Sequence, residues 1–443
     1  MAVTSAASAS GLSFAHVFRA LQHRDYRLFF IGQGISLVGT WMQQVAMSWL
    51  VYRLTGSAFA LGAIAFASQF PTFLLAPIAG VVADRYRRHR IVVITQSLAL
   101  LEASTVATLV LTGTVQVWHL IALSTVLGTV NAFDIPARQS LVVKLVEGPE
   151  DLANAIALNS SMFNAARLVG PAIAGVLIGV VGEGPVFAIN AASYIAVLTS
   201  LFRMSVAKEE KPERQSRALS HMREGFSYAF GFPPIRSILT LLALTSLLGM
   251  PYVVLLPVFA SEVLGGGPQT LGFLMSAAGL GALAGALYLA SRSSVRGLSR
   301  VIVIAVTVFG LGLIAFSRSR WQPLSIALLL VTGFGMMVQS ASINTVLQTI
   351  VDEDKRGRVM SLYAMAFMGM APFGSLLAGA LASRIGAPAT VMLGGIACLG
   401  AAGWFYSRLP TIRELVRPIY IRLGIIPEVA TGLQSATELR PKV

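Results

Sequence analysis

Residues 80–90 read Gly-Val-Val-Ala-Asp-Arg-Tyr-Arg-Arg-His-Arg and lie between two apolar runs, 58–82 and 91–111. The segment concentrates four arginines and an aspartate, whereas the flanking runs are almost without charge. A helix of about 20 apolar residues crosses the hydrocarbon core of a bilayer. The pattern therefore predicts two membrane-spanning helices that are joined by a short basic loop.

The same alternation of apolar runs and short loops continues along the chain of 443 residues. Hydrophobic residues make up 55% and charged residues only 12% of it, against about 25% charged residues in an ordinary soluble domain. We therefore expect an all-α membrane protein with twelve transmembrane helices in two pseudo-symmetric six-helix bundles. The expected spans are 28–52, 58–82, 91–111, 118–136, 153–181, 185–204, 237–261, 269–291, 301–317, 321–346, 358–383 and 388–407.

The basic residues predict the orientation of these spans. Of the 33 lysines and arginines, 28 fall in the termini and in alternate loops when the N-terminus is placed in the cytoplasm. Cytoplasmic loops of membrane proteins collect Lys and Arg, so we expect both termini in the cytoplasm. The net charge of +14 is then a topology signal, and no nucleic-acid partner is expected.

The spans and charged stretches predict five regions. We expect an amphipathic N-terminal segment, with an interfacial helix over about 13–30 that leads into the first span. Gly170-Pro171 in span five recurs weakly as Ala371-Pro372 in span eleven, as expected for duplicated halves. The expected regions are the N-terminal segment 1–27, bundles 28–204 and 237–407, a cytoplasmic linker 205–236 and a cytoplasmic tail 408–443.

Several motifs resemble one transporter family. Residues 80–90 resemble the signature loop of the major facilitator superfamily, and Gly170-Pro171 with Gly175 resembles the motif of its exporters and antiporters. Further stretches are similar to the bacterial transmembrane secretion effector branch, which includes enterobactin and macrolide exporters. They are residues 39–44, 54–57, 132–139 and 154–159.

The resemblance implies a major facilitator fold and a cytoplasmic gate at the signature loop. The gate residues that it implies are Gly80, Asp84, Arg85, Arg88 and Arg138. An acid at a helix end is stabilised by the N-terminal dipole of a neighbouring helix, which is the role expected for Asp84. Arg87 stands where the family usually has glycine, so the turn is expected to differ there. A solvated basic loop that serves topology alone is the alternative.

Few ionisable residues lie within the expected spans. Glu102 and Arg167 are each deep in a span, and Asp134 lies near the cytoplasmic end of span four. A charge at the bilayer centre costs at least ~2.5–3.5 kcal/mol unless it meets a partner or water. Burial favours the neutral form of a carboxyl group, so Glu102 and Asp134 are candidates for proton coupling. Structural pairing is the alternative.

Two stripes of polar residues predict a water-filled cavity. Gln33, Thr40 and Gln44 share a face of span one, and Gln339 and Ser342 share a face of span ten. Because in the family spans one, four, seven and ten line the central cavity, we expect these residues to line it. Hydrogen bonding between helices is the alternative. The cavity set is completed by Trp41, Asn131 and Arg167.

Small residues in spans five, eight and eleven predict close helix packing. In the family these helices form the seam between the two halves. The glycines concerned are Gly170, Gly175, Gly179, Gly281, Gly285, Gly374 and Gly379.

The sequence contains no motif that indicates a nucleotide-driven pump, a metal site or an enzyme. No lysine follows a glycine, so a phosphate-binding loop is excluded, and the five histidines and the lone Cys398 lack metal-ligand spacing. We expect no enzyme, cofactor or metal. The sequence predicts a monomeric, proton-coupled exporter of small amphipathic or hydrophobic molecules, drug- or siderophore-like, in a bacterial cytoplasmic membrane. The alternatives are a lysophospholipid or nutrient carrier or uniporter and, from another class, a membrane enzyme or receptor.

Overall fold

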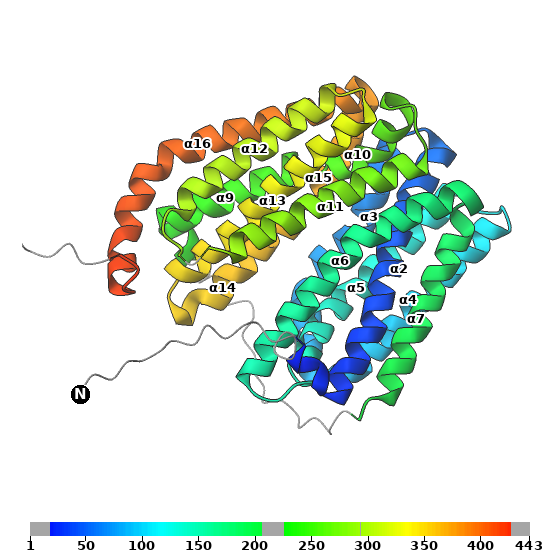
Figure 1. The fold of residues 1–443 in the computed structure, drawn as a ribbon, viewed down its shortest axis with the longest axis horizontal. Helices are drawn as coiled ribbons and strands as arrows, with labels where there is room; N and C mark the ends of the chain where they lie inside the picture. Colours follow the sequence, from blue (N-terminus) through cyan, green and yellow to red (C-terminus); the bar gives the residue numbers. More distant parts are fainter. Residues whose placement is uncertain (1–17, 206–225, 293, 427–443) are drawn as a thin grey trace, which may run out of the picture. The chain divides into compact units, whose positions relative to one another are not determined.

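The computed structural model describes residues 18–205, 226–292 and 294–426, except for the side chain of Asp84. All regular elements in these ranges are helices (Figure 1). They form two compact units, one from the described parts of Met1–Leu50 and Phe70–Arg214, the other from those of Val51–Gln69 and Gln215–Val443.

The first unit is built mainly from six long helices. Helix α4 packs against α5 and α7, and α6 packs against α7. The elements are η1 (Arg19–Gln22), α2 (Arg24–Thr55), α3 (Ala58–Arg85), α4 (Arg88–Leu111), α5 (Val117–Val142), α6 (Pro149–Val181) and α7 (Glu183–Arg203).

The second unit has the same number of spans but more interruptions. Helix α13 packs against α11 and α12, and α16 packs against α12 and α9. The elements are α9 (Pro233–Leu248), α10 (Tyr252–Val258), the π-helical η2 (Phe259–Val263), α11 (Pro268–Ala290), α12 (Leu298–Arg318), α13 (Gln322–Ile350), α14 (Glu353–Ala364), the π-helical η3 (Met365–Gly369), α15 (Ala371–Ile385) and α16 (Ala387–Arg422).

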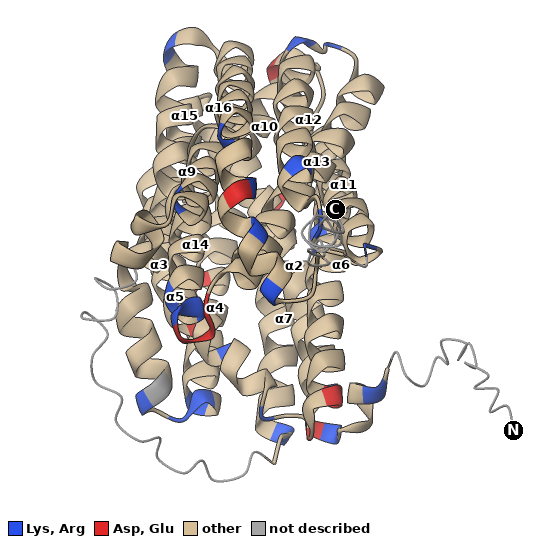
Figure 2. Ribbon diagram, turned by 90° about the vertical axis from the view of Figure 1, so that its left-hand side faces the viewer, with Lys and Arg blue, Asp and Glu red and all other residues tan. Residues whose placement is uncertain are grey.

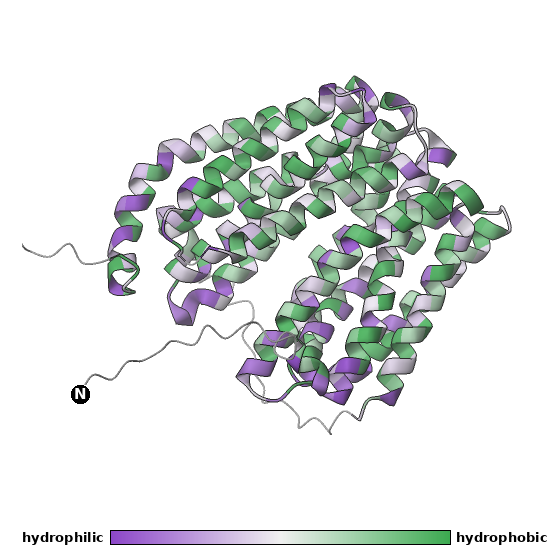
Figure 3. Ribbon diagram, in the orientation of Figure 1, coloured by the Kyte–Doolittle hydropathy of each residue, from purple (hydrophilic) through white to green (hydrophobic). Residues whose placement is uncertain are grey.

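Hydropathy matches the expected spans. In the described ranges, eleven helical segments are long and apolar enough to cross a membrane. Helix α2, the first expected span, has 32 residues and is long enough, but its glutamines lower its hydropathy. Apolar residues fill the middles of the helices (Figure 3), and most charged residues lie toward helix ends (Figure 2). The helix count therefore agrees with the prediction.

Two of the expected spans are interrupted rather than continuous. The seventh breaks at Gly249–Pro251 between α9 and α10, and the eleventh passes through η3 before Pro372. Proline lacks an N–H and cannot continue the hydrogen-bond ladder. The breaks meet, since a Cβ on Gly374 would lie 2.3 Å from the Leu247 carbonyl oxygen and 2.7 Å from Pro251 Cγ.

Both ends of the chain differ from the sequence prediction. Of the expected 13–30 helix, residues 19–22 form the 3₁₀ turn η1 and residues 24–30 belong to α2, while residues 13–17 lie outside the described residues. His23 is extended, and Arg19 and His23 both bind Asp151 at the start of α6, at 2.6 and 2.8 Å. Helix α16 continues to Arg422, beyond the expected end of the span at 407.

Residues 51–69, which the sequence places in the first bundle, cluster with the second unit. Gly62 lies against Gly379 of α15, where an added Cβ would come within 3.0 Å of the Gly379 Cα. The Phe66 and Phe373 rings contact edge to face at 5.9 Å, and the Tyr52 hydroxyl donates to Glu262 in η2. Backbone contact between small residues therefore holds this end of α3 in the second unit.

The other glycines of the expected seam pack within one bundle. Gly170 lies against Trp41 and Val38 of α2, and Gly281 of α11 lies against the Leu330 carbonyl of α13. Gly374 faces α9, as described above. Gly379 meets α3. Close packing is therefore confirmed for the glycines whose contacts are described, and it joins helices of one bundle at Gly170, Gly281 and Gly374.

The contact at Gly281 predicts a steep cost for a single methyl group. A Cβ there would lie 1.9 Å from the Leu330 carbonyl oxygen, so Gly281→Ala must separate α11 from α13. We expect a loss of about 1–3 kcal/mol, seen as a lower thermal unfolding temperature in detergent. Gly400→Ala on α16, where a Cβ meets open space, should match the native protein. Equal unfolding temperatures for the two variants would contradict the prediction.

Candidate functional site

A buried carboxyl group lies among three helices of the first unit. Glu102 of α4 is 2% exposed, and its Oε2 accepts a hydrogen bond of 3.1 Å from Gln43 Nε2 of α2. The Gln43 Oε1 in turn accepts one of 2.5 Å from Asn190 Nδ2 of α7. Among the described residues, the Glu102 Oε1 has no hydrogen-bond partner and the carboxyl has no ion pair.

This network is geometrically tight at its α7 end. Ser193 donates to the Asn190 Oδ1 at 3.2 Å. A Cβ on Gly39 of α2 would lie 2.5 Å from the Asn190 Oδ1 and 2.6 Å from the Ser193 Oγ. Glycine at position 39 therefore lets α2 approach α7 closely enough for Gln43 to bridge Glu102 and Asn190. Chemically, the chain of amides holds one carboxyl oxygen and leaves the other able to carry a proton.

The second buried acid has a compensating cation. Asp134 of α5 is 2% exposed, and its Oδ2 lies 3.1 Å from Arg138 Nε, one turn along the same helix. Its Oδ1 accepts hydrogen bonds from Thr95 at 2.7 Å and from Gln96 at 2.9 Å, both of α4. Asp134 and Glu102 thus both bond to side chains beside them, but only Asp134 is ion-paired among the described residues.

A third group joins α2 to α6. The Arg167 guanidinium lies 5.9 Å from the centre of the Trp41 ring, within cation–π range. The Phe163 ring contacts the same indole edge to face at 5.8 Å. Trp41 and Arg167 are half-buried and Phe163 is exposed, so the group offers one cation and two aromatic faces to a ligand.

The polar residues predicted to line the cavity from span one differ in their exposure. Thr40 and Gln44 are exposed and Asn131 of α5 is half-buried, as a cavity lining requires, but Gln33 is only 3% exposed. The Gln33 Oε1 is buried and has no hydrogen-bond partner among the described residues.

The polar residues of span ten do not lie where the prediction placed them. Gln339 and Ser342 were expected to line a water-filled cavity, but they are 2% and 0% exposed. Gln339 donates to the Thr245 hydroxyl of α9 at 2.5 Å, and Gly335 of the same face packs on α12 at Ala305 and Phe309. A helical period identifies a shared face but not what covers it, and here the covering is protein.

The expected gate residues lie where α3 gives way to α4. Gly80 and Arg85 belong to α3 and Arg88 begins α4, while the Asp84 side chain lies outside the described part. Arg87 has φ −62° and ψ 115°, an extended conformation that needs no glycine. Arg138, which the resemblance assigns to this gate, forms an ion pair with Asp134.

The Gly-Pro motif supports the aromatic group. Gly170, Pro171 and Gly175 are buried in α6, and a Cβ on Gly170 would lie 2.6 Å from the Trp41 Cβ and 3.0 Å from the Val38 carbonyl. The motif therefore lets α6 lie against α2 at Trp41.

Sequence reasoning missed Gln43, Asn190 and the Tyr52–Glu262 pair. Gln43 adjoins the predicted Gln44 but lies on the buried face of α2, and Asn190 is a polar residue within an expected span, which is the signal that could have found it. The described residues contain no cluster of three or more potential metal ligands.

Residues 15–418 match the family of transmembrane secretion effectors. The chain belongs to this family. The predicted resemblance to this branch of the major facilitators is thereby confirmed, together with the membrane-transporter class and the major facilitator fold.

Relatives of this secretion effector agree over nearly the whole chain. The staphyloferrin A transporter of Staphylococcus aureus is 27% identical over 385 residues, 86% of this chain and 96% of the relative. The multidrug efflux pump Tap of Mycolicibacterium fortuitum is 26% identical over 394 residues, 87% and 93%. A crystal structure of a POT family transporter in complex with 5-aminolevulinic acid superposes with a TM-score of 0.72 at 10% identity, covering 88% of this chain and 96% of that one.

The ion pair in the secretion effector makes a stability prediction. Asp134→Asn leaves Arg138 without its partner and should lower the free energy of unfolding by about 1–3 kcal/mol. Asp134→Asn combined with Arg138→Met removes both charges and should restore part of the loss. Thermal unfolding of the detergent-solubilised single and double variants measures this, and a double variant less stable than Asp134→Asn alone would contradict it.

Proposed function

We propose that this protein is a proton-coupled exporter of small amphipathic or hydrophobic molecules that works by alternating access. The observation that carries the proposal is Glu102, a buried carboxyl group in the membrane interior that neutral amides hold and that no cation compensates among the described residues. Such a group is stable when protonated and costly when ionised. Taking up and releasing a proton therefore changes the energy of the bundle.

Proton release needs a structural consequence if it is to drive transport. When Glu102 is ionised, the carboxylate strengthens its hydrogen bond from Gln43, which also holds Asn190. Protonation or deprotonation of Glu102 on α4 thereby changes the hydrogen bonds that α4 shares with α2 and α7. Asp134 is the second candidate carrier, but it already pairs with Arg138, so we assign it a structural role.

The cargo site that we propose contains Trp41, Phe163 and Arg167, with Thr40, Gln44 and Asn131 as polar contacts. Aromatic faces bind flat apolar groups, and the guanidinium binds an acidic group. Drug-like and siderophore-like molecules combine both. The relatives named for staphyloferrin A and for multidrug efflux support this class of cargo. An exporter is favoured over the lysophospholipid or nutrient carrier, because the relatives described above are named for siderophore transport and for drug efflux.

Alternating access requires contacts that open. We assign the contact of Gly62 with Gly379 and the Tyr52–Glu262 hydrogen bond to one gate, and Gly80, Asp84, Arg85 and Arg88 to the gate at the opposite membrane face. We further propose a monomer in a bacterial cytoplasmic membrane with both termini in the cytoplasm. The arginine and lysine distribution supports this orientation.

Neutralising Glu102 should uncouple the exporter. In proteoliposomes with an imposed pH difference, the native protein should accumulate a fluorescent amphipathic dye, and a protonophore should abolish the accumulation. Glu102→Gln keeps the side-chain shape and should only let the dye equilibrate, because no proton is carried. Glu414→Gln, at an exposed position on α16, is the control and should behave as native. Accumulation by Glu102→Gln would refute the assignment, and pH-independent equilibration by the native protein would favour a uniporter.

The aromatic group should set cargo preference. Arg167→Lys keeps the charge but loses the flat guanidinium, so the KM for an anionic aromatic dye should rise about threefold to tenfold while that for a cationic dye of similar size changes little. Trp41→Leu should raise both. Initial uptake rates in everted vesicles measure the KM values, with Arg318→Lys as control. A KM for the anionic dye that neither variant changes would remove this group from the site.

A further inference from the structure

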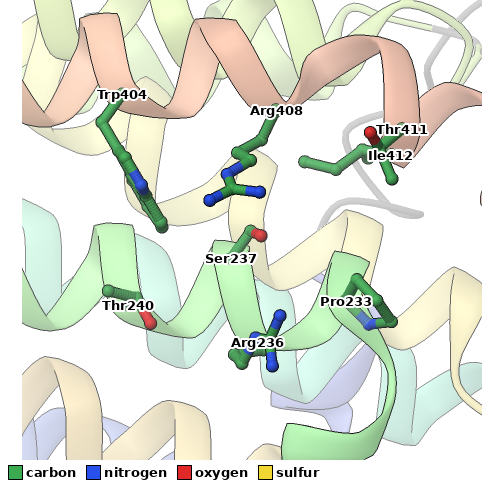
Figure 4. Close-up of a pocket in the computed structure, with 8 residues that line it drawn as sticks. All are labelled: Pro233, Arg236, Ser237, Thr240, Trp404, Arg408, Thr411 and Ile412. Carbon is green, nitrogen blue, oxygen red and sulfur yellow. The ribbon is translucent and has the colours of Figure 1, made fainter.

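A pocket of about 280 Å³ opens between α9 and α16 in the second unit, away from the groups that the proposed transport uses. Figure 4 shows Trp404 and Arg408 extending from α16 toward α9, where Ser237 faces them, and Arg236 and Thr240 on the other edge of α9. Those that matter for its chemistry are Arg236, Ser237 and Thr240 of α9 with Trp404, Arg408 and Thr411 of α16.

Two cations of the pocket lack acidic partners. Arg408 extends from α16 toward Ser237 of α9, and Arg236 lies on the α9 side (Figure 4). In the described part of the chain, neither guanidinium has an ion pair or a hydrogen bond. Arg19 and Arg138, by contrast, each bind an acid. Two uncompensated guanidinium groups beside one pocket favour an anionic ligand.

The hydroxyl groups of the pocket are also available. Most helical Ser and Thr residues here donate to a carbonyl of the preceding turn, as Thr245 of α9 does to Leu241. Within the described ranges, Ser237, Thr240 and Thr411 make no hydrogen bond. The pocket therefore joins two cations to three free hydroxyls, which is the donor set that binds phosphate oxygens.

The position and the volume of the pocket limit the class of ligand that it can bind. The pocket lies at the first turns of α9, the end that the basic residues assign to the cytoplasm, and tryptophan is typical of the membrane–water interface. Drug-sized ligands occupy pockets of about 300–1,000 Å³, so this smaller one suits a headgroup better than a whole cargo molecule. The cytoplasmic leaflet is rich in anionic lipids, which bind basic pockets between helices.

We propose that this pocket binds the phosphate of an anionic phospholipid of the cytoplasmic leaflet. Arg236 and Arg408 hold the phosphate oxygens from two sides, and the hydroxyls of Ser237 and Thr411 donate to the remaining ones. A free phosphate ion offers the same oxygens, so the test separates the two sources. Because α9 leads to the break at Gly249–Pro251, an occupied pocket also ties the start of this span to α16.

The test uses the full-length protein in a neutral detergent. Its thermal unfolding is followed with added phosphatidylglycerol, with phosphatidylcholine of the same chains, and with inorganic phosphate. We expect saturable stabilisation by phosphatidylglycerol alone. Arg236→Gln with Arg408→Gln should weaken it at least tenfold. Arg413→Gln with Arg417→Gln, exposed arginines of the same helix that do not line the pocket, should leave it unchanged.

Three results would overturn the proposal. These are equal stabilisation by both lipids, equal weakening by both double variants, and stabilisation by inorganic phosphate at the same concentrations as phosphatidylglycerol, which would assign the pocket to a soluble phosphate ligand. If the glutamine variant does not fold, Arg236→Lys with Arg408→Lys replaces it. That variant keeps both charges without the forked geometry and should weaken the binding by a smaller factor, whereas unchanged binding would count against the arginine pair.

Discussion

The cost of placing charge in hydrocarbon is the constraint on which this structure depends. The ionisable groups within its spans meet that cost in different ways. Asp134 binds Arg138 and two neutral donors, and Arg167 lies over the Trp41 ring. Glu102 accepts one hydrogen bond from the Gln43 amide, and its other oxygen has no partner among the described residues. The first two arrangements compensate a charge, whereas no cation compensates the Glu102 carboxyl among the described residues, and the proposed mechanism therefore assigns the proton to Glu102.

Both units combine side-chain hydrogen bonds with close contacts between helix backbones. In the first, side-chain hydrogen bonds through Gln43 and Asn190 tie α2, α4 and α7 together. In the second, helices meet backbone to backbone, as at Gly281 and Gly374, and two spans are interrupted by π-helical turns and prolines. Small residues let helix backbones approach closely. Among the described residues, the hydrogen-bonded carboxyl of Glu102 belongs to the first unit and the two interrupted spans belong to the second.

Hydropathy predicted the helices because a membrane span must be long, apolar and internally hydrogen-bonded. The depth of Glu102 and Arg167 was predictable for the same reason. The side of each helix was not, since Gln339 and Ser342 share a helical face that protein covers, and Gln43 faces Glu102 while the adjacent Gln44 is exposed. The extension of α16 to Arg422 also escaped prediction, because hydropathy ends with the membrane and a helix need not.

The many arginines of this chain serve two purposes, membrane orientation and the proposed binding of a ligand. The positive-inside rule explains why so many arginines share one side of the membrane, but it treats them as equivalent. Their surroundings distinguish them. Arg19 and Arg138 bind acids in the same unit, whereas Arg236 and Arg408, from two separate helices, line one pocket together with hydroxyl groups that make no hydrogen bond among the described residues. The positive-inside rule does not require two arginines to share a pocket, and the proposed anionic ligand accounts for that placement.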